Sequence, residues 1–230
     1  MDSRNLTHKR ITVFLGHYGS GKTNIAINYA LMLSRQKDNV VIADLDIVNP
    51  YFRTKDSKDM LSDKGIRLIC SEYANTNVDT PALPADIYSV FHDKTTTGVL
   101  DVGGDDRGAL ALGRYVDFLK EENNYEILFV INKFRPLTKD AISTVSVMKE
   151  IESASGIKFT AIVNNSNLGE ETTKEDVLSS LEYANEISKI TNLPIKMTCV
   201  KEDLVKELDC INNIQPIKLY VRQSWLKQEE

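Results

Sequence analysis

The sequence has little cysteine and no strong bias in charge. Its three cysteines (Cys70, Cys199 and Cys210) lie far apart and form no C-x-x-C pair, so neither a zinc site nor a disulfide framework is indicated. Among 230 residues, 28 Lys and Arg stand against 33 Asp and Glu, which gives a formal net charge of −5. This mild acidity argues against general binding to nucleic acid or to an anionic membrane surface.

Long apolar runs are also absent. No stretch of 18 apolar residues occurs, and residues 1–10 lack the apolar segment of a secretory signal. We therefore expect a cytoplasmic protein with no stable membrane anchor and no nucleic-acid partner. No repeat or low-complexity linker divides the chain, which predicts one domain over residues 1–230. For its C-terminal tail, 216–230, an edge strand or a packed tail is favoured over an amphipathic surface helix.

A glycine-rich loop near the start of the chain is the most specific feature present. Residues 16–23, the phosphate loop, match G-x-x-x-x-G-K-[ST] at every fixed position, between an apolar run and a helical pattern. In that context the backbone N–H groups and the start of the helix attract phosphate, whereas the plain alternative is an ordinary glycine turn. Lys22 would reach the terminal phosphates and Thr23 would bind Mg²⁺. The expected nucleotide-binding residues of the loop are Gly16, His17, Tyr18, Gly19, Ser20, Gly21, Lys22 and Thr23.

Apolar runs alternate with helical patterns along the whole chain. Because most of these runs are continuously apolar, they predict a mostly parallel sheet covered on both faces. The expected fold class is α/β, a three-layer α/β/α arrangement with about 7–8 strands, as in P-loop NTPases. The predicted strands are 10–15, 40–46, 66–70, 98–102, 126–132, 159–165 and 195–200. The predicted helices are 22–36, 54–64, 84–91, 108–120, 138–153, 173–190 and 202–208, and 71–83 is expected to be a surface loop.

Acidic residues follow two of the predicted strands at their carboxyl ends, where ligands sit in such sheets. Asp101 begins a D-x-x-G segment, which suits a carboxylate beside a metal and places the Gly104 N–H near a γ-phosphate. Asp44 and Asp46 are two residues apart and would point to the same side of an extended strand. One would lie near Mg²⁺ and the other near the attacking water, unless both are solvated carboxylates. The predicted metal ligands are Thr23, Asp44, Asp46 and Asp101.

Asparagine and arginine residues lie beyond the later strands. Asn132, Asn164 and Asn165 carry both donors and acceptors, which suits the edge of a nucleobase, although turn formation is as good an explanation for each. Four arginines either contact phosphates or are solvated, and solvation is favoured for each. These four are Arg53, Arg107, Arg114 and Arg135.

Together these residues resemble the MinD/ParA/CobQ–CobB branch of P-loop NTPases, within the SIMIBI class, over about residues 10–200. Residues 44–50 look like the switch I segment of that branch, and 101–104 look like its switch II segment. The resemblance implies ATP rather than GTP, with Mg²⁺, and a catalytic set of Lys22, Asp46 and Asp101. It implies that Asp46 orients the hydrolytic water, that Asp101 lies near the metal, and that Asn164 lies near the adenine.

One departure from the branch concerns an extra lysine in the phosphate loop. The branch reads K-G-G-x-G-K-[ST], and the lysine at the start of this pattern reaches the nucleotide of a partner subunit. His17 and Tyr18 replace that lysine and the glycine after it, so a homodimer is an alternative and not a firm expectation. The first hypothesis is an ATPase whose hydrolysis switches conformation or drives a protein partner. The others are an ATP-dependent synthetase or small-molecule kinase, with a substrate pocket in 71–95, and a non-hydrolysing nucleotide-binding module.

Overall fold

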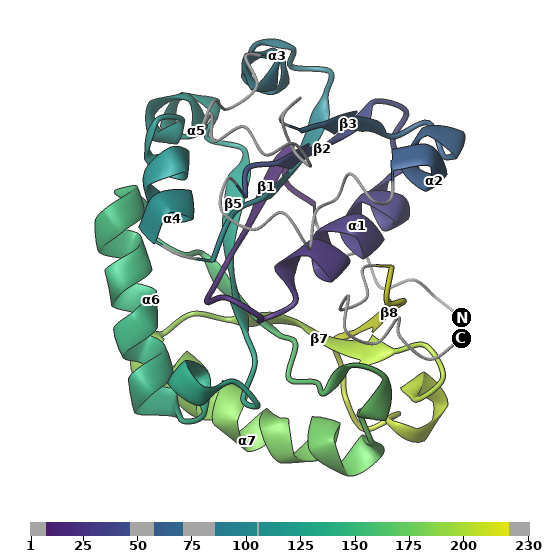
Figure 1. Cartoon of the computed structure of the whole chain (residues 1–230), viewed down its shortest axis with the longest axis vertical. Coiled ribbons are helices and arrows are strands. Elements are labelled where there is room, and N and C mark those ends of the chain that lie inside the picture. The colour runs from purple at the N-terminus through teal and green to yellow at the C-terminus, as the bar shows by residue number, and fades with distance from the viewer. Residues whose placement is uncertain (1–7, 47–57, 71–85, 105, 221–230) are drawn as a thin grey trace, which may run out of the picture.

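The computed structural model describes residues 8–46, 58–70, 86–104 and 106–220. An eight-stranded sheet forms the centre, and each pair of neighbouring strands is parallel (Figure 1). The strands are β1 (Ile11–Leu15), β2 (Val40–Asp44), β3 (Arg67–Ile69), β4 (Thr97–Asp101), β5 (Tyr125–Ile131), β6 (Ala161–Asn164), β7 (Ile195–Lys201) and β8 (Ile214–Ile217). Their order across the sheet is β3-β2-β4-β1-β5-β6-β7-β8, which confirms the predicted fold class.

Helices cover both faces of this sheet (Figure 1). The described α-helices are α1 (Lys22–Leu33), α2 (Lys58–Asp63), α3 (Ile87–His92), α4 (Asp106–Gly113), α5 (Val116–Glu122), α6 (Ala141–Ser155) and α7 (Lys174–Thr191). Short 3₁₀ turns are η2 (Pro136–Thr138), η3 (Gly169–Glu171) and η4 (Val205–Glu207). Among the described residues, no helix is both long enough and apolar enough to cross a membrane.

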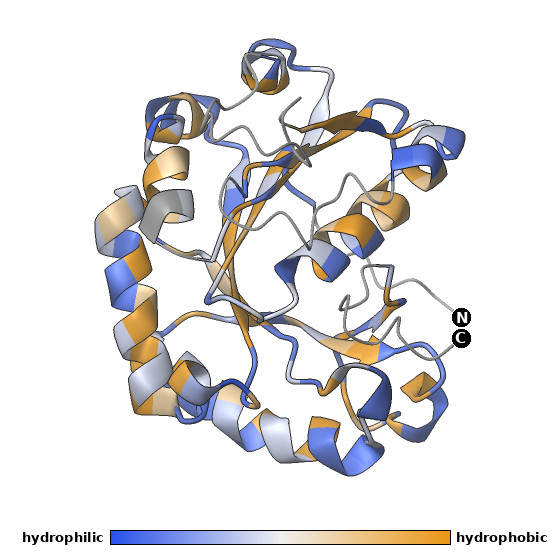
Figure 2. Ribbon diagram, in the orientation of Figure 1, coloured by the Kyte–Doolittle hydropathy of each residue, from blue (hydrophilic) through white to orange (hydrophobic). Residues whose placement is uncertain are grey.

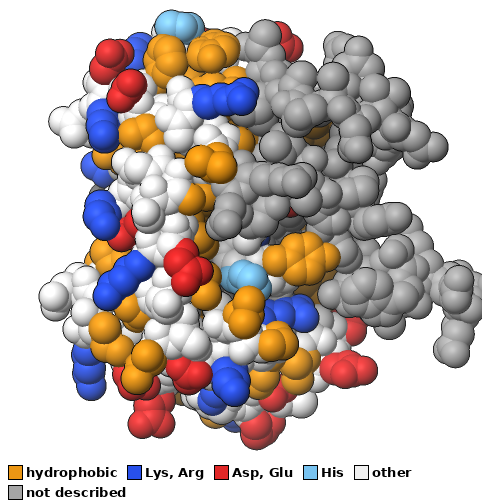
Figure 3. Space-filling view, turned by 60° about the vertical axis from the view of Figure 1, so that its left-hand side comes forward, with side chains coloured by type: hydrophobic (Ala, Val, Ile, Leu, Met, Phe, Trp, Pro, Cys, Tyr) orange, Lys and Arg blue, Asp and Glu red, His pale blue; other side chains and the backbone are white. Residues whose placement is uncertain are grey.

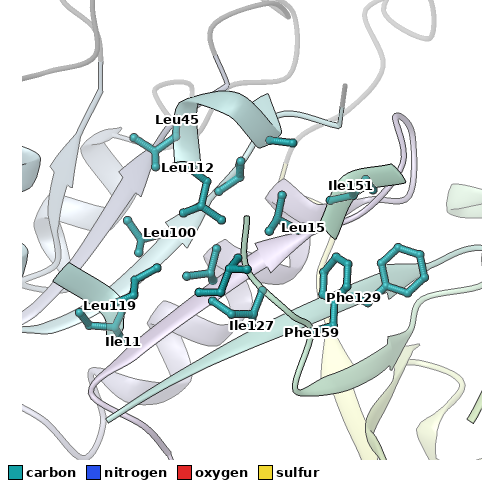
Figure 4. Close-up of a cluster of buried hydrophobic side chains, with 14 of the residues drawn as sticks. Ile11, Leu15, Leu45, Leu100, Leu112, Leu119, Ile127, Phe129, Ile151 and Phe159 are labelled. Carbon is teal, nitrogen blue, oxygen red and sulfur yellow. The ribbon is translucent and has the colours of Figure 1, made fainter. Parts of the chain in front are cut away.

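The two faces of the sheet have separate hydrophobic cores. Alternate side chains of a strand point to opposite faces, so Ile11, Val13 and Leu15 pack with α3–α7, whereas Phe14 packs with α1 and α2. Figure 4 shows the first of these cores, with side chains from the strands and from the covering helices in contact. Figure 2 shows the resulting pattern, in which the strands are largely hydrophobic and the helices carry hydrophilic outer surfaces.

Two predicted helices were wrong in their boundaries. The single helix expected over 108–120 is divided into α4 and α5, because the chain turns at Tyr115 (φ −110°, ψ 1°). The Tyr115 ring is buried there and stacks on Phe91 with 5.4 Å between ring centroids. Thr138 was expected to cap the next helix, but it ends the 3₁₀ turn η2, and Asp140 caps α6 by accepting from the Ser143 N–H at 2.8 Å.

Of the other boundaries, some agree with the sequence, one predicted helix is wrong, and some lie outside the described residues. Gly156 ends α6 in the left-handed conformation (φ 71°), and Thr173 starts α7 through a capping box with Asp176. The helix expected over 202–208 is only the 3₁₀ turn η4. The edge strand beside β7 is β8, which includes only the first two residues of the predicted tail, and Asn28 of α1 accepts from the Lys218 N–H that follows it at 2.9 Å. The predicted loop 71–83 and residues 221–230 lie outside the described residues.

Candidate functional site

The phosphate loop joins β1 to α1 at the carboxyl edge of the sheet. A Cβ atom at Gly16 would lie 2.3 Å from the carbonyl oxygen of Val130, so only glycine fits this close approach to β5. Gly21 has φ +86°, and a Cβ atom there would lie 2.3 Å from the Asn165 amide nitrogen. Both fixed glycines of the pattern therefore have steric reasons in this fold.

Lys22 lies folded against this loop. Gly21 is the N-cap residue of α1, and no side chain caps the helix, so its positive end faces the loop. The Lys22 side chain is buried, and its Nζ donates to the carbonyl oxygen of His17 at 3.2 Å. This arrangement places an ammonium group and a helix start at one point, as binding of an anion requires.

Carboxylates meet the loop from the ends of two neighbouring strands. Asp44 of β2 and Asp101 of β4 are paired in register. The Asp44 carboxylate accepts from the Asp46 N–H at 3.0 Å, and a Cβ atom at Gly103 would lie 3.1 Å from Asp46 Oδ1. Thr23 of α1 donates a side-chain hydrogen bond to Asp101. The structure therefore brings the four predicted metal-side residues to one edge of the sheet, although no group of three or more His, Cys, Asp or Glu in the described ranges forms a metal site unaided.

Asp101 is electrostatically unusual. Burial raises the pKa of Asp101 to about 7, and the negative charge of Asp46 acts in the same direction. The Thr23 hydrogen bond and the positive charge of Lys22 partly oppose this shift. A buried carboxyl that is poised to change its charge near neutral pH, beside a lysine, is typical of a functional site.

Gly104 brings the D-x-x-G segment against the phosphate loop. A Cβ atom at Gly104 would lie 2.6 Å from the backbone nitrogen of Tyr18 and 2.8 Å from Lys22 Nζ. Any side chain would have to displace the loop, so glycine is required for this contact. The predicted neighbourhood of Gly104 and Lys22 is thus present in the fold, while its contact with a γ-phosphate stays a prediction.

The surroundings of His17 disfavour a positive charge on its ring. Partial burial lowers the pKa of His17, and the neighbouring Lys22 charge lowers it further, against a weaker opposite effect of Glu150. His17 is therefore neutral at pH 7, since its ordinary pKa of 6.5 is already below that. Tyr18, which replaces the next glycine, is 55% exposed.

The three asparagines have different surroundings. Asn165 donates from Nδ2 to the carbonyl oxygen of Ser20 at 2.7 Å, so it touches the phosphate loop. Asn164 is fully buried, donates to Ser180 Oγ at 2.9 Å and accepts from Ser166 Oγ at 2.8 Å. Both ends of its side-chain amide thus have protein partners, and contact of Asn164 with a base stays a prediction.

Asn132 shapes the turn after β5. Its Oδ1 accepts from the Phe134 N–H at 3.0 Å, and its Nδ2 donates to the carbonyl oxygen of Asn167 at 3.2 Å. This is the turn-forming alternative that the sequence left open.

Among the arginines, only the surroundings of two side chains are described. Arg114 is exposed, whereas Arg135 Nε donates to the carbonyl oxygen of Gly19 at 2.8 Å. The sequence offered phosphate contact or solvation for Arg135 and missed this contact with the loop backbone. Its position shortly after a strand end was the one available signal. The side chains of Arg53 and Arg107 lie outside the described residues.

Two buried polar atoms at the loop without hydrogen-bond partners bear on whether the loop suits a polar ligand. Ser20 Oγ and Asn165 Oδ1 are buried and have no hydrogen-bond partner among the residues that the structure describes. They flank Gly21 in sequence and in space, respectively. Buried polar atoms are normally satisfied, so these two suit a site whose polar partners come from a ligand or from water. The Ser20 hydroxyl can donate to a phosphate oxygen, beside the buried Lys22 and the uncapped start of α1, whereas Asn165 Oδ1 can only accept and suits a donor such as water.

The parallel sheet, with a glycine loop between its first strand and first helix, has the fold of the P-loop NTPases. No protein-family model matches the chain, and no curated protein matches it in sequence. Solved structures do match the chain in fold.

Several of these solved structures are of FtsY proteins. FtsY from Mycoplasma mycoides is 19% identical over 86% of this chain, with a TM-score of 0.51. The cell division protein FtsY from Thermotoga maritima is 20% identical over 84% of it, with a TM-score of 0.53. The signal recognition particle receptor FtsY from Elizabethkingia anophelis, in complex with GDP, is 16% identical over 87% of it, with a TM-score of 0.50. The chain spans 62%, 62% and 60% of these three chains, and the likeness shows the fold alone.

Proposed function

We propose that this protein binds Mg²⁺–ATP at the phosphate loop and hydrolyses it, so that the nucleotide state switches its conformation or drives a protein partner. The observation that carries the proposal is the meeting of Lys22, Thr23 and Asp101 at the loop, with Lys22 buried and Thr23 bonded to Asp101. A lysine and a hydroxyl at the start of one helix, with a carboxylate from the end of a neighbouring strand, are parts that phosphoryl transfer needs for positioning and charge neutralisation.

Each residue has a distinct proposed role. The loop N–H groups and the Lys22 ammonium hold the phosphates, and Thr23 binds Mg²⁺ with Asp101 and Asp44 on the metal side. Bound Mg²⁺ would neutralise charge on the phosphates. Asp46 orients the attacking water, and its place against Gly103 puts it beside the segment that leads to Gly104. The Gly104 N–H lies where it would respond to the terminal phosphate.

The proposal names ATP, and not GTP, as the nucleotide. The resemblance to the MinD/ParA branch favours ATP, with Asn164 and Asn165 at the base side of the site. The structural likeness to an FtsY solved with GDP makes GTP the alternative. The synthetase or kinase alternative depends on residues 71–95, of which 71–85 lie outside the described residues.

A protein partner is supported by apolar side chains on the surface. Tyr18 of the loop is 55% exposed, Leu137 of η2 57% and Ile142 of α6 77%. Figure 3 shows the face that carries α4 and α6, where hydrophobic side chains lie among charged ones. An exposed tyrosine in the loop, with further exposed apolar side chains on η2 and α6, is suited to a partner that responds to the nucleotide, and a second copy of the chain is one such partner.

Phosphate release tests the proposed hydrolysis. We expect slow release from Mg²⁺–ATP, abolished in Lys22→Ala and in Asp46→Asn, whereas Lys149→Ala, a change at an exposed lysine of α6, leaves it unchanged. The same assay with GTP shows whether the protein prefers adenine or guanine nucleotides. Unchanged hydrolysis by Lys22→Ala would show that the phosphate loop has been assigned wrongly.

A further inference from the structure

Two side chains, each from a loop that follows a strand, donate hydrogen bonds to the backbone of the phosphate loop. Arg135, in the loop after β5, donates from Nε to the carbonyl oxygen of Gly19 at 2.8 Å. Asn165, directly after β6, donates from Nδ2 to the carbonyl oxygen of Ser20 at 2.7 Å. The carbonyl groups of two consecutive loop residues are therefore fixed from the side of β5 and β6.

Fixing these carbonyl groups also fixes the N–H groups that follow them. In a planar trans peptide the C=O and the N–H point in opposite directions. The bond to Gly19 therefore turns the Ser20 N–H away from Arg135, and that N–H closes the loop onto the carbonyl oxygen of His17 at 3.2 Å. The bond to Ser20 turns the Gly21 N–H away from Asn165 in the same manner. Both bonds select one shape of the loop backbone, the part that binds phosphate.

Arg135 is itself held by a bonded turn. Its backbone N–H donates to the carbonyl oxygen of Asn132 at 3.2 Å, and Thr138 Oγ1 donates to the same oxygen at 2.7 Å. Asn132 Nδ2 reaches the carbonyl oxygen of Asn167, and the Lys133 N–H reaches Ser166 Oγ at 3.0 Å, so this turn is tied to the loop after β6. The two anchors of the phosphate loop thus belong to one connected structure, which limits how far either can move.

We propose that Arg135 is a positioning residue that holds the phosphate loop in its phosphate-binding shape, with Asn165 as its companion, and that it acts through Nε on Gly19 and not through its charge on the nucleotide. This inference rests on the proposed nucleotide binding. Gly19, the residue whose carbonyl group Arg135 holds, leaves room for this contact. It has φ +74°, and a Cβ atom there would lie 3.3 Å from Arg135 Nε. A side chain at that position would press on the anchoring group.

Two substitutions separate the hydrogen bond from the charge. In Arg135→Gln, the amide nitrogen is bonded to Cδ as Nε is in arginine, so the donor is kept and the charge is lost. In Arg135→Lys, a CH₂ group takes that place, so the positive charge is kept and no donor remains at the position of Nε. Arg135 is only partly buried, so both variants are expected to fold, and thermal melting verifies this.

Two readouts are used, one of them without any nucleotide. We expect the dissociation constant for Mg²⁺–ATP to stay within about two-fold of wild type in Arg135→Gln and to rise about ten-fold in Arg135→Lys, since a lost hydrogen bond to a charged donor costs that much. In the nucleotide-free protein, hydrogen exchange over residues 16–23 should be faster in Arg135→Lys than in wild type and in Arg135→Gln.

Retained affinity in Arg135→Lys together with lost affinity in Arg135→Gln would overturn the proposal in favour of a direct charge effect on phosphate. Wild-type affinity and wild-type exchange in both variants would also overturn it. If the wild-type protein binds neither ATP nor GTP, the proposed function fails, and the exchange measurement still decides whether Arg135 orders the loop.

Discussion

Single residues at the site show a conflict between stability and function, and Asp101 shows it most clearly. Its carboxyl lies where a metal-side aspartate is needed, but burial there raises its pKa to about 7. The unfolded chain has an ordinary aspartate, with a pKa of 3.8. Between these values the folded state binds the proton more tightly, so the contribution of Asp101 to stability is complete below about pH 4 and is lost as the pH rises through 7.

Asp101→Asn should therefore stabilise the protein above pH 7 while it abolishes hydrolysis. The amide imitates the neutral carboxyl at every pH, so we expect a gain on the order of 4 kcal/mol at pH 8 that disappears toward pH 4. Urea unfolding of the protein free of nucleotide and Mg²⁺, at several pH values, measures this gain. A variant that is less stable than wild type at pH 8 would contradict the role of burial at this carboxyl.

Gly21 is expected to tolerate alanine less well than Gly156. Both residues have left-handed backbones (φ +86° and +71°), but a Cβ atom would meet Asn165 Nδ2 at Gly21 and nothing within 4 Å at Gly156. Gly156→Ala should lose about 1 kcal/mol from backbone strain, with nucleotide affinity retained. Gly21→Ala should lose more stability and at least ten-fold in affinity, because the loop must shift. Equal effects of the two substitutions on affinity would argue against a crowded loop.

At the scale of elements, the sequence predicts those features that depend on neighbouring residues in the chain. The phosphate loop with its flanking strand and helix, the Gly156 stop and the start of α7 all follow from local patterns. The division of α4 from α5 was missed because it depends on Tyr115 stacking against Phe91, a residue of another helix. The start of α6 was misplaced because a 3₁₀ turn, η2, comes before the true cap, Asp140.

The capping box of α7 provides a test at this scale. Thr173 Oγ1 accepts from the Asp176 N–H at 3.2 Å, and the Asp176 carboxylate accepts from the Thr173 N–H at 2.9 Å. Thr173→Ala should cost about 1 kcal/mol of unfolding free energy, and Thr173→Ser should cost little. Both variants should bind nucleotide normally, because α7 contributes none of the proposed phosphate contacts. Chemical denaturation with a parallel affinity measurement tests both expectations.

For the molecule as a whole, the sheet order decides which distant residues meet. Asp44 and Asp101 are far apart in sequence but end adjacent strands, and general rules for parallel sheets predicted that they would converge. The contacts of Arg135 and Asn165 with the phosphate loop could not be predicted in this way. These contacts join residues that are more than 100 positions apart in the chain, in loops after different strands, and no local sequence pattern indicates which side chains will meet there.

A buried network far from the phosphate loop also joins distant elements. Glu126 of β5 accepts from Thr12 Oγ1 at 2.9 Å and from the Tyr29 hydroxyl at 3.0 Å, and it pairs with Lys196 of β7. Glu126→Ala would leave Lys196 largely buried without this partner, so we expect a loss of about 3 kcal/mol or more. Glu126→Gln keeps an acceptor and should lose less. Nucleotide affinity of the folded protein should not change in either variant, since Glu126 lies near the opposite end of its strand from the site.

The most direct test of the central claim is calorimetric titration of the wild-type protein with ATP and with GTP in the presence of Mg²⁺. We expect saturable binding of a nucleoside triphosphate, weakened at least ten-fold by Lys22→Ala and unaffected by Lys149→Ala. The absence of binding heat for both nucleotides, or equal binding by wild type and Lys22→Ala, would contradict the claim that residues 16–23 hold a nucleotide.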